Sequence, residues 1–234
     1  MRKTVVFALI LSMTGLLSGT AQASHPLQNF PVPGLAKNLS RPGNQKLANQ
    51  YRQTLFNRFL KYVTYNSQSD YNQEITPGQI ETAKKLYAEI KALGFKEAVL
   101  SEHYYIFVEI PSNLPWKAPV LGFSCHYDVT PDAKADNIQP QIIKNYQGQR
   151  IVLPKPYNDE VQVIDPQTPT GAYLKTQIGK TIVTSDGSTL LGADDKSGVA
   201  IIMTLLETLA KNPDKKHGPI QIIIAPNEDV GEAD

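Results

Sequence analysis

The stretch of residues 197–225 reads SGVAIIMTLLETLAKNPDKKHGPIQIIIA, and its apolar pattern indicates the class of fold. Its first part, residues 197–211, is apolar on nearly every side and predicts a buried helix. Its last part, residues 220–225, is a continuous apolar run of strand length, and a similar run lies upstream at residues 119–125. A strand, a buried helix and a second strand in this order predict a right-handed crossover within an α/β sheet.

Two amphipathic helices are predicted before this unit. The first has an apolar residue at every fourth position, namely Leu47, Tyr51, Leu55, Phe59 and Val63. The second begins at Thr76-Pro77-Gly78-Gln79, which has the spacing of a capping box, and ends at Gly94. Residues 104–110 predict a strand, whereas residues 131–180, rich in turn-forming and polar residues, predict an excursion from the core fold.

These elements together predict an α/β fold with a mixed, mostly parallel sheet and helices on both of its faces. The chain ends at Asp234, soon after a strand that is expected to be central. Because a sheet of this kind rarely ends without a helix to cover that strand, we expect the chain to be truncated.

Composition narrows the class of protein. The chain has 234 residues, 41% of them hydrophobic, which suits about one domain and excludes a disordered or collagen-like chain. Its 23 basic and 22 acidic residues form no long run of one sign, so no nucleic-acid partner is expected. The single cysteine, Cys125, ends an apolar run and is expected to be a small buried strand residue rather than a metal ligand.

The first 23 residues have the pattern of a signal peptide. Arg2 and Lys3 precede an apolar run over residues 5–17, and Ala21-Gln22-Ala23 is a small-x-small cleavage pattern. The alternative, an uncleaved membrane anchor, is disfavoured because the run is short for a span of about 20 residues. We therefore expect cleavage after Ala23 and a periplasmic or secreted protein without a stable membrane anchor. Residues 24–45 predict an extended lead-in.

Three polar clusters lie where buried elements end or begin. His126 and Asp128 follow the strand at 119–125, and alternation along an extended chain points both side chains the same way, so that the carboxylate can orient the imidazole. Asp194 and Asp195 open the buried helix, where capping alone would need fewer acids. The third cluster, residues 227–229, follows the second buried strand and offers one acid as a ligand and another as a general base.

Each cluster alone fits a simpler interpretation, namely a surface turn, an ordinary helix cap or a solvated acidic turn. Together they follow or adjoin the carboxyl ends of strands, where α/β sheets bind ligands. One histidine with several carboxylates suits a divalent ion such as Zn²⁺, Mn²⁺ or Co²⁺. The sequence therefore predicts a metal site at this edge of the sheet.

The order of these motifs resembles a known family. His126-Tyr127-Asp128, then GADDK at 192–196, then EDVG at 228–231 are similar to the co-catalytic zinc metallopeptidases of the M20 group, and most of all to the tripeptide aminopeptidases of the peptidase T family. The stretches NIQPQIIKNY (137–146) and TIVTSDGSTLLG (181–192) add to the likeness, which runs from about Leu55 to the end. The resemblance implies that residues 46–234 are the N-terminal part of a catalytic domain.

The resemblance also implies a role for each site residue. His126 would bind one zinc ion and Asp128 would orient it, while Asp194 would bridge two ions, with Co²⁺ or Mn²⁺ as alternatives to zinc. Glu228 would be the general base and Asp229 a ligand of the second ion. The family usually has a second glutamate where this chain has Asp229. Its further Asp and His ligands, and its lid or dimerisation domain, would lie beyond residue 234.

The implied function is an exported two-metal aminopeptidase that releases the N-terminal residue of short peptides such as tripeptides. These 234 residues alone would then be incomplete and inactive, and a homodimer would need the missing domain. Two alternatives stay open: another M20-type hydrolase (a dipeptidase, carboxypeptidase or deacylase), or a non-catalytic exported binding protein.

Overall fold

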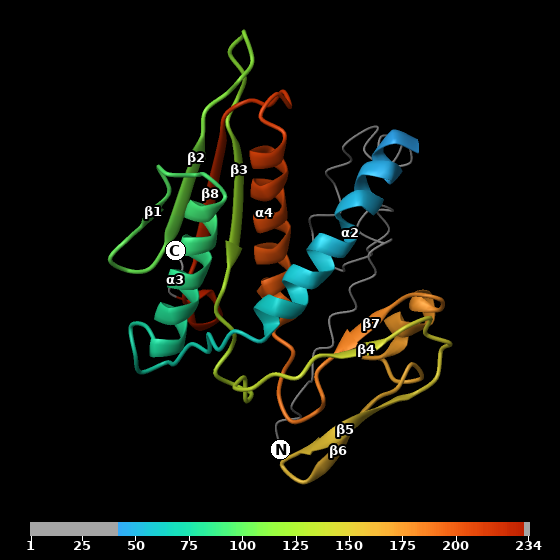
Figure 1. The fold of residues 1–234 in the computed structure, drawn as a ribbon. Helices are drawn as coiled ribbons and strands as arrows, with labels where there is room; N and C mark the ends of the chain where they lie inside the picture. Colours follow the sequence, from blue (N-terminus) through green and yellow to red (C-terminus); the bar gives the residue numbers. More distant parts are fainter. Residues whose placement is uncertain (1–41, 232–234) are drawn as a thin grey trace.

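The structure is a computed structural model that describes residues 42–231 (Figure 1). The signal peptide predicted for residues 1–23, with its cleavage after Ala23, lies outside the described residues, as does most of the lead-in predicted for 24–45. Helix α2 (Pro42–Val63) takes in the last residues of that lead-in. Proline fits the first turn of a helix because its fixed φ is helical and its missing N–H is not needed there.

Two further helices accompany α2. Helix α3 (Pro77–Ala92) begins with the predicted capping box, since Thr76 and Gln79 exchange hydrogen bonds between side chain and backbone. Helix α4 (Ala193–Lys211) is the predicted buried helix. Asp194 and Asp195, in its first turn, have non-helical dihedral angles. In the described part of the chain, no helix is long and apolar enough to cross a bilayer.

The main sheet has the strand order β1-β2-β8-β3. Its strands are β1 (Val99–Leu100), β2 (Ile106–Ile110), β3 (Leu121–His126) and β8 (Ile220–Ala225). The crossover from β3 through α4 to β8 gives one parallel pairing, while β2 lies antiparallel on the other side of β8. The predicted mixed α/β fold is confirmed, although antiparallel pairings are in the majority among the described strands because β2 and β1 both join the sheet antiparallel.

The helices cover one face of this sheet rather than both. Along β2, Ile106 and Val108 are buried whereas Phe107 is 39% exposed, and along β8 the same alternation leaves Ile223 40% exposed. The apolar run of residues 220–225 suggested a strand buried on both faces, but within residues 42–231 only the face toward the helices is covered.

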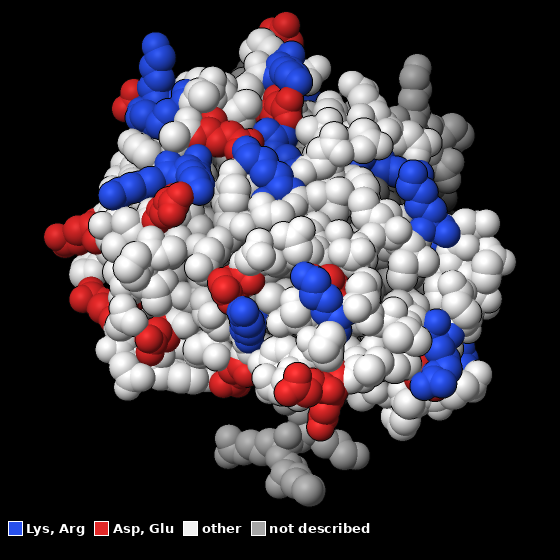
Figure 2. All heavy atoms as spheres, turned by 60° about the horizontal axis from the view of Figure 1, so that its bottom comes forward, with Lys and Arg blue, Asp and Glu red and all other residues white. Residues whose placement is uncertain are grey.

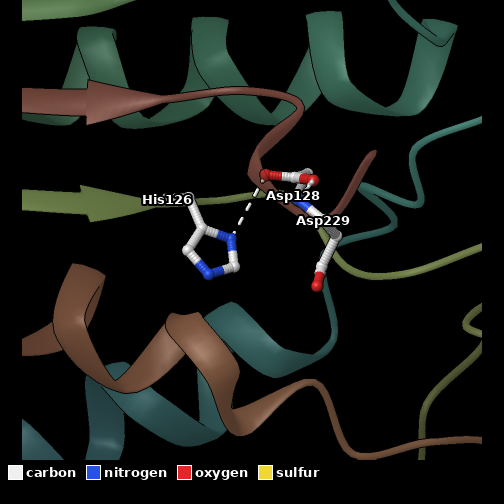
Figure 3. A group of neighbouring side chains, drawn as sticks. All are labelled: His126, Asp128 and Asp229. Carbon is white, nitrogen blue, oxygen red and sulfur yellow. Dashed lines mark hydrogen bonds and ion pairs between the residues drawn. The ribbon is translucent and has the colours of Figure 1, made fainter. Parts of the chain in front are cut away.

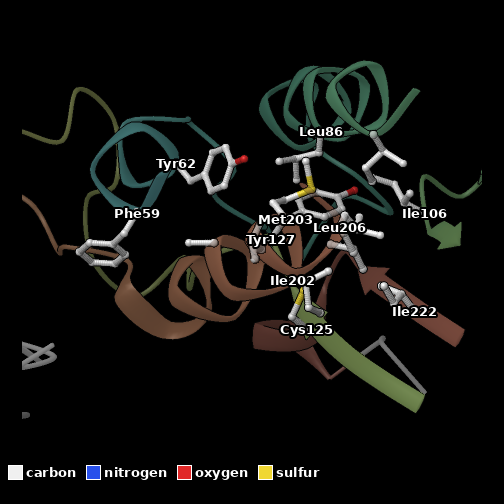
Figure 4. Close-up of a cluster of buried hydrophobic side chains, with 14 of the residues drawn as sticks. Phe59, Tyr62, Leu86, Ile106, Cys125, Tyr127, Ile202, Met203, Leu206 and Ile222 are labelled. Atoms are coloured by element: carbon white, nitrogen blue, oxygen red, sulfur yellow. The ribbon is translucent and has the colours of Figure 1, made fainter. Parts of the chain in front are cut away.

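The main core lies between this face and the three helices (Figure 4). Phe59 and Tyr62 of α2, Leu86 of α3 and Met203 of α4 are fully buried there or nearly so. Cys125 is buried in β3, as predicted. A partly buried ion network joins the same helices, because Arg58 of α2 pairs with a glutamate of each of the other two, Glu89 and Glu207.

The predicted excursion forms a small lobe of its own. Strands β4 (Gln141–Ile143) and β7 (Ile182–Thr184) form one pair, and β5 (Ile151–Tyr157) and β6 (Glu160–Ile164) form another. With the 3₁₀ helix η3 (Ala172–Gln177) they enclose a second, smaller apolar cluster. Acidic and basic side chains are interspersed over the face of the molecule in Figure 2.

Candidate metal centre

The three predicted polar clusters meet at one edge of the main sheet. Strands β3 and β8 run parallel, with His126 in register with Ala225, so the segments that follow both strands start from the same edge. The 3₁₀ helix η4 (Glu228–Val230) comes directly after β8, and the first turn of α4 lies opposite. One possible ligand atom from each of His126, Asp128 and Asp229 lies within 4.8 Å of the others (Figure 3).

Asp128 is the centre of the hydrogen bonding at this edge. Its side chain is fully buried. Oδ1 lies 3.2 Å from His126 Nδ1 and accepts from the backbone N–H of Glu228 at 3.1 Å, while Oδ2 accepts from the N–H of Asp229 at 3.1 Å. One carboxylate thus holds both the imidazole ring and the turn after β8. The sequence indicated only the first of these two contacts.

His126 turns its other ring nitrogen toward two more acids. Nε2 lies 3.3 Å from Asp194 Oδ1 and 3.6 Å from Glu228 Oε2. Nδ1 carries a proton because it faces the carboxylate of Asp128, which can only accept. Nε2 is the nitrogen directed at Asp194 and Glu228. All five predicted site residues therefore converge, with the carboxylates of Asp194 and Glu228 more exposed than that of Asp128.

Negative charge dominates the electrostatics of this edge. Burial lowers the pKa of His126, but the hydrogen bond and charge of Asp128, with further charge from Asp229 and Asp195, outweigh burial and raise that pKa to about 9. Burial, and next the charge of Asp128, raise the pKa of Asp229 to about 6. A cation among these groups would relieve their mutual repulsion. A histidine nitrogen and two carboxylate oxygens, all within 4.8 Å of one another, fit a zinc-like divalent ion.

Asp195 has a different structural role from Asp194. Its Oδ1 accepts from the N–H of Gly198 at 2.8 Å, which caps the first regular turn of α4, and burial raises its pKa. The close approach requires glycine, since a Cβ at position 198 would lie 2.3 Å from Asp195 Oδ2. Capping by Asp195 leaves the carboxylate of Asp194 to face His126.

A buried lysine supports the site from behind and was not expected to do so. Lys196 is 2% exposed, and its Nζ donates to Ser67 Oγ at 2.6 Å and to the carbonyl oxygen of Tyr65 at 3.1 Å. Ser67 Oγ donates in turn to the carbonyl oxygen of Tyr127, at 2.6 Å. Burial lowers the pKa of Lys196 to about 7. The only signal in the sequence was a lysine at the start of an otherwise apolar helix.

Comparisons with known proteins find relatives of this chain. No family model matches the chain. Peptidase T of Alkaliphilus oremlandii is 43% identical over 180 residues, which are 74% of this chain and 42% of that protein. Peptidase T of Brevibacillus brevis is 41% identical over 181 residues, covering 76% of this chain and 43% of that protein. The chain thus spans about two fifths of the length of these relatives.

The relatives also correct one prediction. The N-terminal pattern of Arg2, Lys3 and an apolar run predicted a periplasmic or secreted protein. That prediction is wrong, because the peptidase T relatives are cytosolic enzymes. A basic residue pair followed by a short apolar run is a compositional pattern, and it carries less information than identity over most of the chain.

A solved structure shows the same fold. The aminopeptidase PepT of Bacillus cereus superimposes on the chain with a TM-score of 0.52 at 21% identity, over 77% of this chain and 38% of that protein. Sequence identity near 40% over three quarters of the chain agrees with this likeness in fold. The chain is therefore a homologue of peptidase T, about 40% identical to these relatives over about three quarters of its length.

Proposed function

We propose that this chain provides part of the metal site of a two-metal aminopeptidase that releases the N-terminal residue of short peptides such as tripeptides. The observation that supports the proposal most is the hydrogen bonding of Asp128, which orients His126 and holds the turn of Glu228 and Asp229 with a single carboxylate. A histidine oriented in this way by an acid is typical of metal ligands. The names of the relatives supply the peptidase class.

In this proposal each acid has its own role. His126 Nε2 and Asp229 would be ligands of separate zinc ions, and Asp194, which lies 3.3 Å from Nε2, would be a ligand shared by both. Asp128 orients rather than binds, because its two oxygens already accept from three donors. Zinc ions held here would polarise the scissile carbonyl and lower the pKa of a bound water.

Glu228 is the proposed general base. Its carboxylate is 57% exposed and lies beside His126 Nε2, so it faces the place where a substrate carbonyl would approach. Glu228 takes up a proton from the attacking water and returns it to the nitrogen of the leaving amine. Its backbone N–H is fixed by Asp128, which keeps the carboxylate at the edge of the sheet.

Hydrolysis of peptides with a free and with an acetylated N-terminus tests this proposal. A full-length protein that contains this chain, loaded with zinc, is expected to cleave a free tripeptide and to reject the acetylated one, whereas these 234 residues alone are expected to be inactive. Glu228→Gln is expected to abolish cleavage while zinc binding is retained. Cleavage that survives Glu228→Gln would exclude the proposed base, and cleavage of the blocked peptide would favour a carboxypeptidase or deacylase instead.

A further inference from the structure

A pair of buried amides joins helix α3 to the turn that follows β8. Gln79, in the first turn of α3, is fully buried, and its Nε2 donates to Asn227 Oδ1 at 2.6 Å. Asn227 Nδ2 donates in turn to the carbonyl oxygen of Glu74. Gln79 and Asn227 are 148 residues apart, so this contact belongs to the tertiary structure and not to the helix.

The capping box fixes the direction of the Gln79 amide. Its Oε1 accepts from the N–H of Thr76 at 2.9 Å, while its backbone N–H donates to Thr76 Oγ1 at 3.3 Å. Because Oε1 must face that donor, Nε2 must face Asn227. A capping box by itself places no requirement on Nε2, so the contact with Asn227 is additional to capping.

Asn227 begins the turn that contains Glu228 and Asp229. It has a φ of 57° in the left-handed region, and its side chain is held by Gln79 on one side and Glu74 on the other. The next two backbone N–H groups are held by Asp128. The turn is therefore held through the Asn227 side chain as well as by the acid that orients His126.

We propose that Gln79 is a positioning residue of the metal site, which acts through Asn227 to place Asp229 and Glu228. This inference rests on the proposed metal site. Without the Nε2 donor, the Asn227 side chain would lose its contact with Gln79, and the turn of Glu228 and Asp229 would be held less firmly. Binding of a cation by Asp229 would weaken, although Gln79 lies outside the group of possible ligands.

Two variants separate positioning from helix capping. Gln79→Glu keeps the oxygen that accepts from Thr76 but places a second oxygen against Asn227 Oδ1, and Gln79→Met keeps the length of the side chain without either polar group. Thr76→Ala is the matched control, because it weakens the cap of α3 and leaves the Gln79 amide in place. Affinity for Co²⁺ is measured by its visible absorption, and the melting temperature is measured on the same samples.

We expect Gln79→Glu and Gln79→Met to bind Co²⁺ at least about 10-fold more weakly than the wild type. Loss of a residue that holds a metal ligand typically lowers metal affinity by this much. Thr76→Ala should lower the melting temperature yet change the affinity less than about twofold, because its loss is that of a helix cap. Asn227→Gly, which tolerates the positive φ, should weaken binding as well. Adding Gln79→Met to Asn227→Gly should then weaken it no further, because Gln79 acts through Asn227.

Three results would overturn the inference. Folded Gln79 variants that bind Co²⁺ as the wild type does would show that the amide pair is only structural. Additive losses in the double variant would show that Gln79 does not act through Asn227. Failure of the wild-type chain to bind Co²⁺ would overturn the proposed metal site itself, and this inference with it.

Discussion

Replacing Asp128 by asparagine tests how the site is held together. The carboxylate accepts from His126 Nδ1 and from the backbone N–H groups of Glu228 and Asp229. In Asp128→Asn the remaining oxygen can still accept at the Oδ1 position, but the new NH₂ group faces the N–H of Asp229. Two donors then meet in a fully buried place.

The expected cost follows from these three contacts. Hydrogen bonds to a charged group contribute about 1.5–3 kcal/mol each, and a buried donor left unsatisfied costs about 1–3 kcal/mol. We therefore expect Asp128→Asn to lower the free energy of unfolding of the metal-free protein by about 2–5 kcal/mol, and the affinity for Zn²⁺ by about 10–100-fold.

Urea unfolding and zinc titration measure these two effects. Asp132→Asn is the control, since Asp132 is an exposed acid whose contact is with the hydroxyl of Tyr71; its effect on stability should stay within about 0.5 kcal/mol. If Asp128→Asn behaves like this control in both assays, the Asp128 carboxylate does not organise the site.

Three further variants test the ion network of Arg58, the cap of α4 and the charge of His126. Arg58→Met should destabilise the fold by about 2–4 kcal/mol in urea, because it leaves two partly buried glutamates without their shared partner; Lys85→Met, which breaks an exposed pair, should cost less than about 0.5 kcal/mol. Gly198→Ala should cost about 1–3 kcal/mol through its clash with the cap of α4, whereas Gly122→Ala has open space around its Cβ and should be nearly neutral. The folded protein raises the pKa of His126 to about 9, so the proton bound by His126 stabilises the metal-free fold. This stabilisation is fully present below pH 6.5 and is lost as the pH rises toward 9. The difference in unfolding free energy between the wild type and His126→Gln should therefore shrink by up to about 3 kcal/mol between pH 6.5 and pH 9.

Each of these expectations has a result that opposes it. Equal losses for Arg58→Met and Lys85→Met would mean that burial does not strengthen the network of Arg58. A stabilised Gly198→Ala would show that helix propensity outweighs the contact with the cap. A difference for His126→Gln that grows with pH would mean that the fold favours the neutral imidazole.

The sequence predicted most of the elements that carry the site. Alternation along an extended chain correctly put His126 and Asp128 side by side, and the capping box at Thr76 correctly began α3. These predictions succeeded because they depend on neighbours in the chain. Burial alternation along β8 was missed, because Ile223 is as apolar as the buried residues beside it.

Contacts between segments that are far apart in the sequence could not be predicted from it. No local pattern indicates that the Asp128 carboxylate accepts from N–H groups 100 and 101 residues away, or that Gln79 holds Asn227. Lys196 directly follows Asp194 and Asp195 in the sequence, but its partner Ser67 lies in the loop after α2, so the sequence does not indicate this contact. Such contacts depend on how the helices pack on the sheet, which the periodicity of each helix alone does not determine.

In the proposed site, His126, Asp194 and Asp229 together hold two zinc ions at the edge of the sheet, and Asp194 is shared between them. Anomalous scattering at the zinc edge, from crystals grown with Zn²⁺, measures this directly. We expect a peak about 2.0–2.2 Å from His126 Nε2 and from a carboxylate oxygen of Asp194. A peak at Nδ1, a peak at another place such as Cys125, or no peak in this region at all would contradict the account.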